Sequence, residues 1–240
     1  MPLRVGFHVE GWDHLILRAY LAKLLELPED DIDPDWIDAP GRGWEFVLQV
    51  IPSALKRFYG KCAQFAVVGV DNDGNVDLDA QGIGEDPKHA RHDLHVGSIN
   101  AECRWCQIDQ IVRRVRPELN WLPEKPGTHW PVLIAVPVEA IEAWLLTSRA
   151  LVQQQRALLR AEMQSRRNLK QQFYGRPAAT SDDVQRVALP LVRSMDASHI
   201  ESLKSHSRSF AMFAQQVECQ AERILGPRDC WAPGDKGAEG

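Results

Sequence analysis

The sequence has no long run of apolar residues. Its longest run is the eight residues from position 131 to position 138, whereas a membrane-spanning helix needs roughly 20. The first residues, MPLRVGFHVEG, also lack the charged start, apolar stretch and small-residue cleavage site of an export signal. We therefore expect no association with a membrane and a location in the cytoplasm.

Cysteine is scarce, and the motifs of two large enzyme classes are missing. The five cysteines are an odd number and are scattered along the chain, which argues against a disulfide framework. There is no Gly-x-Ser-x-Gly motif and no phosphate-cradling Gly-x-x-x-x-Gly-Lys motif. The sequence therefore gives no support to an acyl hydrolase or an ATPase, and any coupled ATP hydrolysis has to come from a partner protein.

The chain also lacks the general excess of basic residues that is typical of proteins that coat nucleic acid, since its net charge is −5. The charges are unevenly distributed. Residues 26–38 hold seven acids and no base, and residues 149–176 hold seven bases and one acid. This asymmetry indicates a polyanionic partner for the second half of the chain, although any one of these bases is explained equally well by a solvated helix face.

The apolar residues alternate between the spacings of strands and of helices up to residue 146. Strands are predicted at 3–9, 36–37, 64–70 and 131–136, and helices at 12–20, 46–58, 106–115 and 138–146. Pro52 is expected to kink or divide the second helix. Because strands joined by helices run parallel, this pattern predicts an α/β fold with a Rossmann-like, mostly parallel sheet and helices on both faces.

Beyond Ser148 the pattern is helical only, with helices predicted at 151–173, 183–195 and 207–224. This change suggests three parts. Residues 1–148 form an α/β domain in which 75–106 are a loop or insertion containing His and Cys. Residues 149–226 form a helical region, and residues 227–240 form a flexible tail.

Acidic residues follow two of the predicted strands. Glu10 comes directly after the first strand, and Asp71 and Asp73 follow the apolar strand at 64–70. In a parallel sheet, functional groups collect at the carboxyl ends of the strands, and residues two apart in an extended segment point to the same side. Asp71 and Asp73 can therefore share a hard cation such as Mg²⁺. An ordinary turn is at least as good an explanation of the five residues 71–75 taken alone.

The segments 9–11, Val-Glu-Gly, and 70–74, Val-Asp-Asn-Asp-Gly, resemble the Toprim family, which includes topoisomerases, bacterial primases and the overcoming-lysogenisation-defect nucleases. The likeness extends over about the first 175 residues. It implies that Glu10, Asp71 and Asp73 hold Mg²⁺ or Mn²⁺, and that Glu10 works as general acid or base in a catalytic domain. Residues 77–100 are longer and richer in His than a minimal Toprim domain needs, and a second Asp-x-Asp is missing, which leaves one ion or two open.

A second likeness lies in residues 137–146, Pro-Val-Glu-Ala-Ile-Glu-Ala-Trp-Leu-Leu, and more weakly in 168–170 and 174–175. These segments resemble Toprim-like proteins of bacterial genomes, several of which occur beside defence genes. The resemblance implies a metal-dependent nuclease that acts on DNA or RNA as an effector of anti-phage defence, together with a partner ATPase. A homo-oligomer is compatible with this interpretation.

Four further residues are candidates for the site. Glu139 and Glu142 lie three apart at a predicted helix start and share a face, from which either could ligate a second ion. A place in the first helical turn, where the helix dipole favours negative charge, explains Glu139 equally well. Lys170 and Arg42 are the cations best placed to meet a phosphate, although each alone is more often a surface residue.

Histidine and cysteine residues cluster in the predicted insertion. His89, His92 and His95 recur at every third position, and Cys103 and Cys106 follow. Zinc takes four Cys or His ligands, so this cluster is a candidate structural zinc site. A second Cys-x-x-Cys pair is missing, however, and two thiols packed as small hydrophobic groups at a helix start are the better-supported interpretation.

The bases of the second half suggest a surface for nucleic acid. On a continuous helix, Arg156, Arg160 and Arg167 lie at spacings of four and seven and therefore share one face. The main alternative to a nuclease is a catalytically silent Toprim-like subunit that binds nucleic acid or regulates a partner. A primase or topoisomerase ranks lower, because neither a nucleophilic tyrosine context nor a primase zinc domain is evident.

Overall fold

One parallel sheet forms the centre of the structure. This computed structural model describes residues 2–37, 43–71, 103–115, 130–137, 140–154, 161–164 and 166–226. Within them, the strands β1 (Leu3–His8), β2 (Ile32–Trp36), β3 (Phe65–Gly69) and β4 (Val132–Ala135) pair in parallel in the order β2-β1-β3-β4. The predicted α/β fold with a parallel sheet is confirmed.

The central strand β3 is buried on both faces, as the apolar run at 64–70 predicts. Phe65 and Val67 pack into the hydrophobic cluster on one side of the sheet, and Ala66 and Val68 pack into the cluster on the other. The alternation follows from the strand geometry, since successive side chains point to opposite faces. A continuous apolar run is therefore what this position in the sheet requires.

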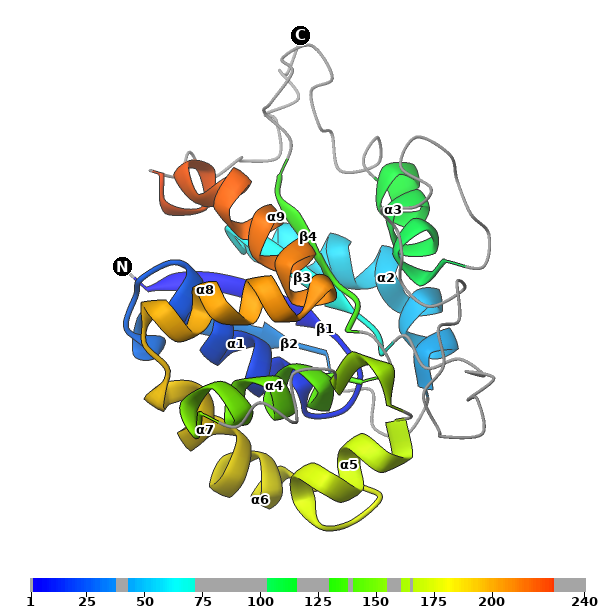
Figure 1. Ribbon diagram of the computed structural model, residues 1–240. Coiled ribbons are helices and arrows are strands. Elements are labelled where there is room, and N and C mark those ends of the chain that lie inside the picture. Colours follow the sequence, from blue (N-terminus) through cyan, green and yellow to red (C-terminus); the bar gives the residue numbers. More distant parts are fainter. Residues whose placement is uncertain are drawn as a thin grey trace, which may run out of the picture.

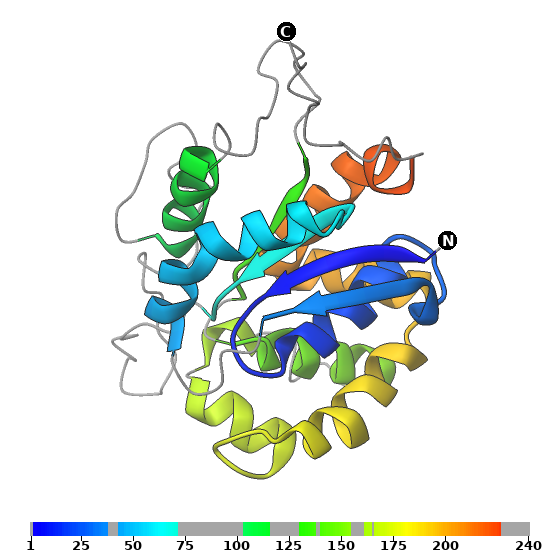
Figure 2. The same ribbon diagram turned by 180° about the vertical axis from the view of Figure 1, so that it is seen from behind.

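Helices cover both faces of the sheet (Figures 1 and 2). On one face, α2 (Gly43–Gly60) and α3 (Arg104–Val115) pack against the strands. On the other face lie α1 (Asp13–Leu24) and α4 (Glu142–Val152). Pro52 lies inside α2, which continues through it as one helix. Among the helices described, none combines the length and the apolar character that crossing a bilayer requires.

The C-terminal part is helical, as predicted. It begins with a short 3-10 turn, η5 (Ala161–Met163), and continues with α5 (Arg166–Tyr174), α6 (Ser181–Asp183), a π-helical turn (Val184–Ala188), α7 (Leu189–Ser194), α8 (Ala197–His206) and α9 (Arg208–Leu225). A second 3-10 turn, η1 (Glu29–Asp31), precedes β2. Helix α9 contacts β4, and α8 contacts α4, so the helical region packs on the face that α1 and α4 cover.

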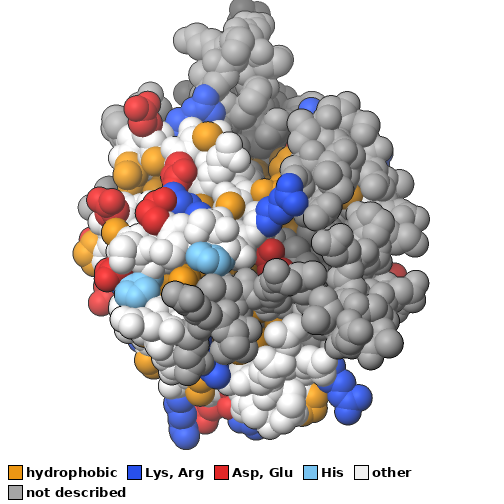
Figure 3. Space-filling view, in the orientation of Figure 1, with side chains coloured by type: hydrophobic (Ala, Val, Ile, Leu, Met, Phe, Trp, Pro, Cys, Tyr) orange, Lys and Arg blue, Asp and Glu red, His pale blue; other side chains and the backbone are white. Residues whose placement is uncertain are grey.

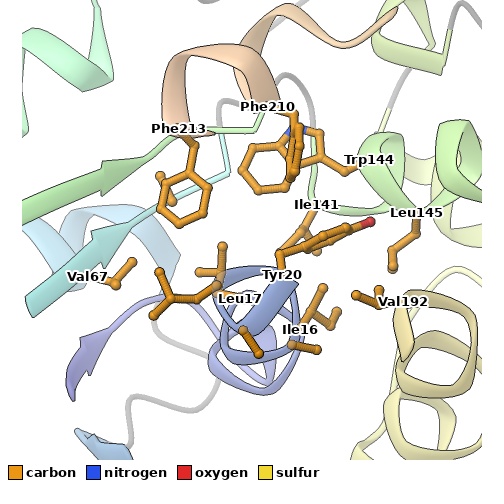
Figure 4. Close-up of a cluster of buried hydrophobic side chains, with 14 of the residues drawn as sticks. Ile16, Leu17, Tyr20, Val67, Ile141, Trp144, Leu145, Val192, Phe210 and Phe213 are labelled. Atoms are coloured by element: carbon orange, nitrogen blue, oxygen red, sulfur yellow. The ribbon is translucent and has the colours of Figure 1, made fainter. Parts of the chain in front are cut away.

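Aromatic side chains join this region to α1 and α4, the helices that cover this face of the sheet (Figure 4). The rings of Tyr20 and Trp144 each meet the ring of Phe210 edge to face, with centroids 5.1 and 5.2 Å apart. The buried indole N–H of Trp144 donates to Oγ of Ser209 at 2.7 Å. Side chains of α1, α4 and α9 thus share one core. The predicted boundary after residue 148 falls inside α4, and the division into domains stays a prediction.

Helix α9 also protects the edge strand β4. The side-chain amide of Gln216 accepts the N–H of Ile134 and donates to the carbonyl of the same residue, both at 2.9 Å. An open sheet edge leaves such backbone groups unpaired and invites further strands. The helical region therefore supports the sheet at its β4 side.

One predicted helix is wrong in its continuity. Helix α4 ends at Val152, and Gln154 has a φ of 56°, a left-handed conformation that stops a helix. The predicted helix at 151–173 is therefore interrupted, and within the described residues it resumes as an α-helix at Arg166. The predicted helix at 183–195 corresponds to contiguous helical residues from Ser181 to Ser194. It contains the π-helical turn just before Pro190, a residue without a backbone donor.

Candidate functional site

The strand order creates a switch point between β1 and β3. From β1 the chain moves to β2 on one side of the sheet, and later to β3 on the other. In open α/β sheets, ligands bind in the crevice at the carboxyl ends of the two strands where the order reverses. Glu10 lies two residues beyond β1, and Asp71 lies two residues beyond β3. The fold therefore brings these two distant acids to one place.

Asp71 is almost completely buried, with 1% of its surface exposed. Its Oδ1 accepts the backbone N–H of Ile141 at 3.1 Å, and its Oδ2 lies 3.2 Å from Nη2 of Arg166. Its backbone carbonyl accepts a hydrogen bond from Arg104, whose guanidinium lies over the ring of Trp44. Asp71 is therefore fixed by contacts with the start of α4 and with α3 and α5.

Glu10 and Asp71 share the guanidinium of Arg166. The same Nη2 that lies 3.2 Å from Asp71 lies 3.5 Å from Oε2 of Glu10. The side chain of Glu10 is 11% exposed and that of Arg166 35% exposed. Because Gly11 adopts a positive φ of 51°, the chain turns sharply after Glu10 into the first turn of α1. A positive charge thus lies beside both acids, in the position where a cation is expected.

A second ion pair lies in the same pocket. Nζ of Lys170 is 3.1 Å from Oε1 of Glu142, and both side chains are largely buried. Burial and the charge of Asp71 raise the pKa of Glu142, although Lys170 opposes this. Burial acts to lower the pKa of Lys170, but Glu142, Asp71 and Asp13 outweigh it and the pKa is raised. Lys170 therefore keeps its positive charge.

Asp13 and Tyr174 complete the polar lining. Burial, followed by the charges of Asp71, Glu142 and Glu10, raises the pKa of Asp13 well above its ordinary value. Burial is also the main cause of the raised pKa of Tyr174. Among the described residues, the hydroxyl of Tyr174 has no hydrogen-bond partner. The lining thus combines four acids with the three bases Arg166, Arg167 and Lys170.

These side chains line a single pocket of about 540 Å³. Its polar lining comes from the turn after β1, the end of β3, the start of α4 and one face of α5. The lining residues are Glu10, Gly11, Trp12, Asp13, Gly43, Asp71, Glu142, Arg166, Arg167, Lys170, Tyr174, Pro177, Ala178, Ala179 and Val184. Five of the residues predicted from the sequence are therefore neighbours in space, namely Glu10, Asp71, Glu142, Arg167 and Lys170. Asp73, Glu139, Arg42, Arg156 and Arg160 lie outside the described residues.

The chemistry of the lining fits a hard divalent cation. Four of its side chains carry carboxylate oxygens, which Mg²⁺ and Mn²⁺ prefer. Oε2 of Glu142 is buried and has no hydrogen-bond partner within the described part of the chain. In that part, no three Cys, His, Asp or Glu side chains are already grouped closely enough to hold a metal ion. Binding therefore requires Asp73, a shift of one carboxylate, or oxygens of water and substrate.

Comparison with known proteins does not assign the chain to a family. No protein-family model, curated protein or solved structure matches the chain. The resemblance to the Toprim family consequently stays a hypothesis. It depends on the short motifs around Glu10 and Asp71.

The predicted zinc cluster is described only at its cysteine end. His89, His92 and His95 lie outside the described residues. Cys103 and Cys106 form no disulfide with a described residue and are buried at the start of α3. Burial raises the pKa of Cys103 to about 11, which favours a neutral thiol in a metal-free protein. Zinc binding by this segment stays a prediction.

The predicted row of arginines needs a correction. Arg156 and Arg160 lie outside the described residues, and the 3-10 turn η5 at Ala161–Met163 separates them in the chain from Arg167 of α5, so the three do not belong to one continuous α-helix. Arg167 is exposed at the rim of the pocket instead. On the face shown in Figure 3, basic and acidic side chains of the described residues are interspersed rather than gathered into one basic surface.

Sequence reasoning missed three residues of the site: Asp13, Arg166 and Tyr174. A signal for two of them was present. Arg166, Lys170 and Tyr174 follow one another at intervals of four, which places them on one face of a helix. Asp13 lies three residues after Glu10, at the start of the predicted helix, where an acid is common for local reasons.

The raised pKa of Asp13 predicts how stability depends on pH. The carboxyl group of Asp13 binds its proton more tightly in the folded protein than in the unfolded chain. The free energy of unfolding therefore falls as the pH rises from the ordinary pKa of 3.8 toward the raised pKa of the folded state. Asp13→Asn should therefore raise the melting temperature at pH 8 by about 2–5 °C and have little effect near pH 4. Calorimetry at both pH values measures this. Asp182→Asn, in the first turn of α6, is the control, and an equal effect at both pH values would contradict the assignment.

Proposed function

We propose that this pocket is the active site of a metal-dependent nuclease that hydrolyses phosphodiester bonds in DNA or RNA. The observation that carries the proposal is the meeting of Glu10 and Asp71 with Arg166 and Lys170 at the switch point of the sheet. Carboxylates are the ligands of a divalent cation, and guanidinium and ammonium groups bind phosphate. Both requirements of phosphodiester hydrolysis are thus met in one pocket.

Glu10, Asp71 and Asp73 are the residues proposed to hold Mg²⁺ or Mn²⁺. The ion, when bound, polarises a phosphate and stabilises the leaving oxygen. Glu10 is the proposed general base, because its side chain is partly exposed and a water molecule can reach it. Asp71, which is buried and hydrogen-bonded to Ile141, is better suited to a fixed position in the ligand set.

Lys170 and Arg166 are the proposed phosphate contacts. Lys170 keeps its charge because its pKa is raised by the acids around it. Glu142 orients this ammonium group at 3.1 Å. Arg166 lies beside both proposed metal ligands, so that a phosphate entering between them meets its guanidinium directly.

The biological setting belongs to the same proposal. The resemblance of residues 137–146 to Toprim-like proteins from bacterial defence loci supports a role in anti-phage defence with a partner ATPase in the cytoplasm. The proposed substrate is nucleic acid. An assembly of several copies of the chain is compatible with this role.

Cleavage by the purified full-length chain tests the proposal. Supercoiled plasmid, linear duplex DNA, single-stranded DNA and single-stranded RNA are incubated with Mg²⁺, Mn²⁺ or EDTA, and again with the product of any ATPase gene found next to the gene of this chain. We expect at least one substrate to be cut in the presence of metal and none in EDTA. If no substrate is cut under any condition, the nuclease proposal is wrong.

A catalytically silent binding subunit is the second candidate, and Arg166 favours it. The guanidinium already provides Glu10 and Asp71 with a positive charge, and this arrangement can persist without a metal. A silent subunit binds oligonucleotides equally well with and without divalent cations and releases no product. The cleavage assay and a binding assay together distinguish the two candidates.

A further inference from the structure

A row of three aromatic side chains lies beside the pocket. It consists of Trp12, His14 and Trp36, and we call it the aromatic row. The centroids of His14 and Trp36 are 5.2 Å apart with the rings nearly parallel, and those of Trp12 and His14 are 6.3 Å apart with the rings tilted by 43°. His14 is buried, whereas Trp12 and Trp36 are 42% and 46% exposed.

The sheet and the turn after β1 place the row at the strand ends. Trp36 is the last residue of β2 and is paired in register with Phe7 of β1. Trp12 follows Gly11 at the turn into α1, and His14 lies in the first turn of that helix. All three side chains therefore come from the carboxyl ends of β1 and β2, next to the switch point between β1 and β3.

The exposure of both indoles is unusual for so large an apolar side chain. In the described part of the chain, the other large hydrophobic residues with comparable exposure are Val187 and Leu225, on helices of the C-terminal region. The buried imidazole of His14 is a ring neighbour of both indoles. The row is thus an ordered surface that offers two indoles to a ligand.

The row continues into the pocket. Trp12 itself lines the pocket, together with Glu10 and Asp71. Arg167 lines it as well, is exposed, and forms no ion pair or hydrogen bond with any described residue. A ligand that reaches from the pocket to the row therefore meets carboxylates, a cation and aromatic rings in sequence.

The acids of β2 do not prevent a polyanion from approaching the row. Asp33 is paired with Arg4 at 3.2 Å, and Asp35 is paired with Arg57 at 2.6 Å and with Lys61 at 3.1 Å. The negative charge of this strand is therefore largely neutralised within the protein.

We propose that the aromatic row is a stacking platform for unpaired nucleobases of a single strand whose sugar–phosphate backbone passes the pocket. The inference rests on the proposed function and adds the class of substrate. Every nucleobase has a π-face that stacks on an indole without regard to sequence. In a duplex these faces are covered by neighbouring base pairs, so a single-stranded segment or an extruded base is required.

Binding of matched oligonucleotides tests the platform. Fluorescence anisotropy compares a labelled single-stranded DNA of thymidines, an abasic oligonucleotide with the same number of phosphates, and the corresponding RNA. Measurements with EDTA and with Ca²⁺ keep the substrate intact. Because base–aromatic stacking is worth about tenfold or more in affinity for each base, the wild-type chain should bind the thymidine strand at least about tenfold more tightly than the abasic strand.

The variant that carries both Trp12→Leu and Trp36→Leu keeps apolar side chains but removes the rings. We expect this double variant to bind the thymidine and abasic strands within about twofold of each other. Val187→Ala, a change at the other kind of exposed apolar site, should leave the preference for bases intact. Circular dichroism checks that the double Leu variant is folded. If it is not folded, a variant with Phe at both positions replaces it, and because this variant keeps two aromatic rings it should keep part of the preference for bases.

Two results overturn the platform: a wild-type chain that binds abasic and base-bearing strands equally, and a double Leu variant that keeps the full preference. The cleavage assay separates this outcome from the proposed function. If the chain cleaves in the presence of metal but has no preference for bases, the stacking platform is wrong and the proposed nuclease function stands. If the chain prefers bases but does not cleave, the proposed nuclease function is wrong and the stacking platform stands.

Discussion

Replacing Asp71 with asparagine is expected to slow metal-dependent cleavage by at least about a hundredfold, because the charge that holds the metal is lost. Asparagine keeps the oxygen that accepts the N–H of Ile141, so the anchor between the end of β3 and the start of α4 is retained. The pair with Arg166 is weakened, but repulsion from Asp13 and Glu142 is relieved as well. These changes in stability partly cancel.

The measurement compares initial rates of wild type and Asp71→Asn on the best substrate in Mg²⁺ and Mn²⁺. Thermal unfolding in EDTA is recorded in parallel, and we expect the melting temperature to change by no more than about 4 °C. Asp109→Asn is the matched control, since Asp109 is an acid on α3 whose partner is Arg113 at the surface. A variant that cuts at the wild-type rate would remove Asp71 from the site.

Replacing Arg166 with methionine is expected to raise the affinity for Mn²⁺ by about tenfold or more and, at the same time, to reduce cleavage. The pocket lining holds the four acids Glu10, Asp13, Asp71 and Glu142 and the three bases Arg166, Arg167 and Lys170. Arg166 is the base that lies beside both Glu10 and Asp71. Removing Arg166 takes away the positive charge beside Glu10 and Asp71, which strengthens their attraction for a divalent ion. The loss of the proposed phosphate contact lowers the rate even when metal is saturating.

Arg167→Met is the control for this prediction, because Arg167 is the adjacent residue, lines the same pocket and lies in no ion pair with described residues. It should leave metal affinity nearly unchanged. Calorimetric titration provides the affinities, and single-turnover cleavage provides the rates. If Arg166→Met binds Mn²⁺ no better than wild type, Arg166 does not compete with a metal at this site.

The positions of Glu10 and Asp71 could be predicted because each follows a strand with an unambiguous pattern. A parallel arrangement brings the carboxyl ends of strands to one edge, so two acids at strand ends become neighbours whatever lies between them. Lys170 and Glu142 were proposed separately, and the structure brings them together as an ion pair. Their pairing depends on how α5 packs against α4, and the local sequence pattern of either helix does not predict this packing.

Arg166 could not be predicted for the same reason. It reaches Glu10 and Asp71 because α4 stops at Val152 and the chain enters a new helix at Arg166. The apolar spacing across this region fits a single helix. The helix α4 ends at the left-handed Gln154, and no glycine or proline at this position signals the end of a helix in the sequence. The aromatic row was missed because Trp12 has the spacing of a core residue of α1, although it is exposed.

Direct measurement of Mn²⁺ binding tests the central claim, that Glu10 and Asp71 form a divalent-metal site. The full-length chain is titrated with Mn²⁺, and the free ion is followed by electron paramagnetic resonance for wild type, Glu10→Gln, Asp71→Asn and Asp109→Asn. The account predicts saturable binding to wild type and Asp109→Asn, with affinity reduced by about tenfold or more in Glu10→Gln and Asp71→Asn. No saturable binding to wild type, or equal affinity in all four proteins, would contradict it.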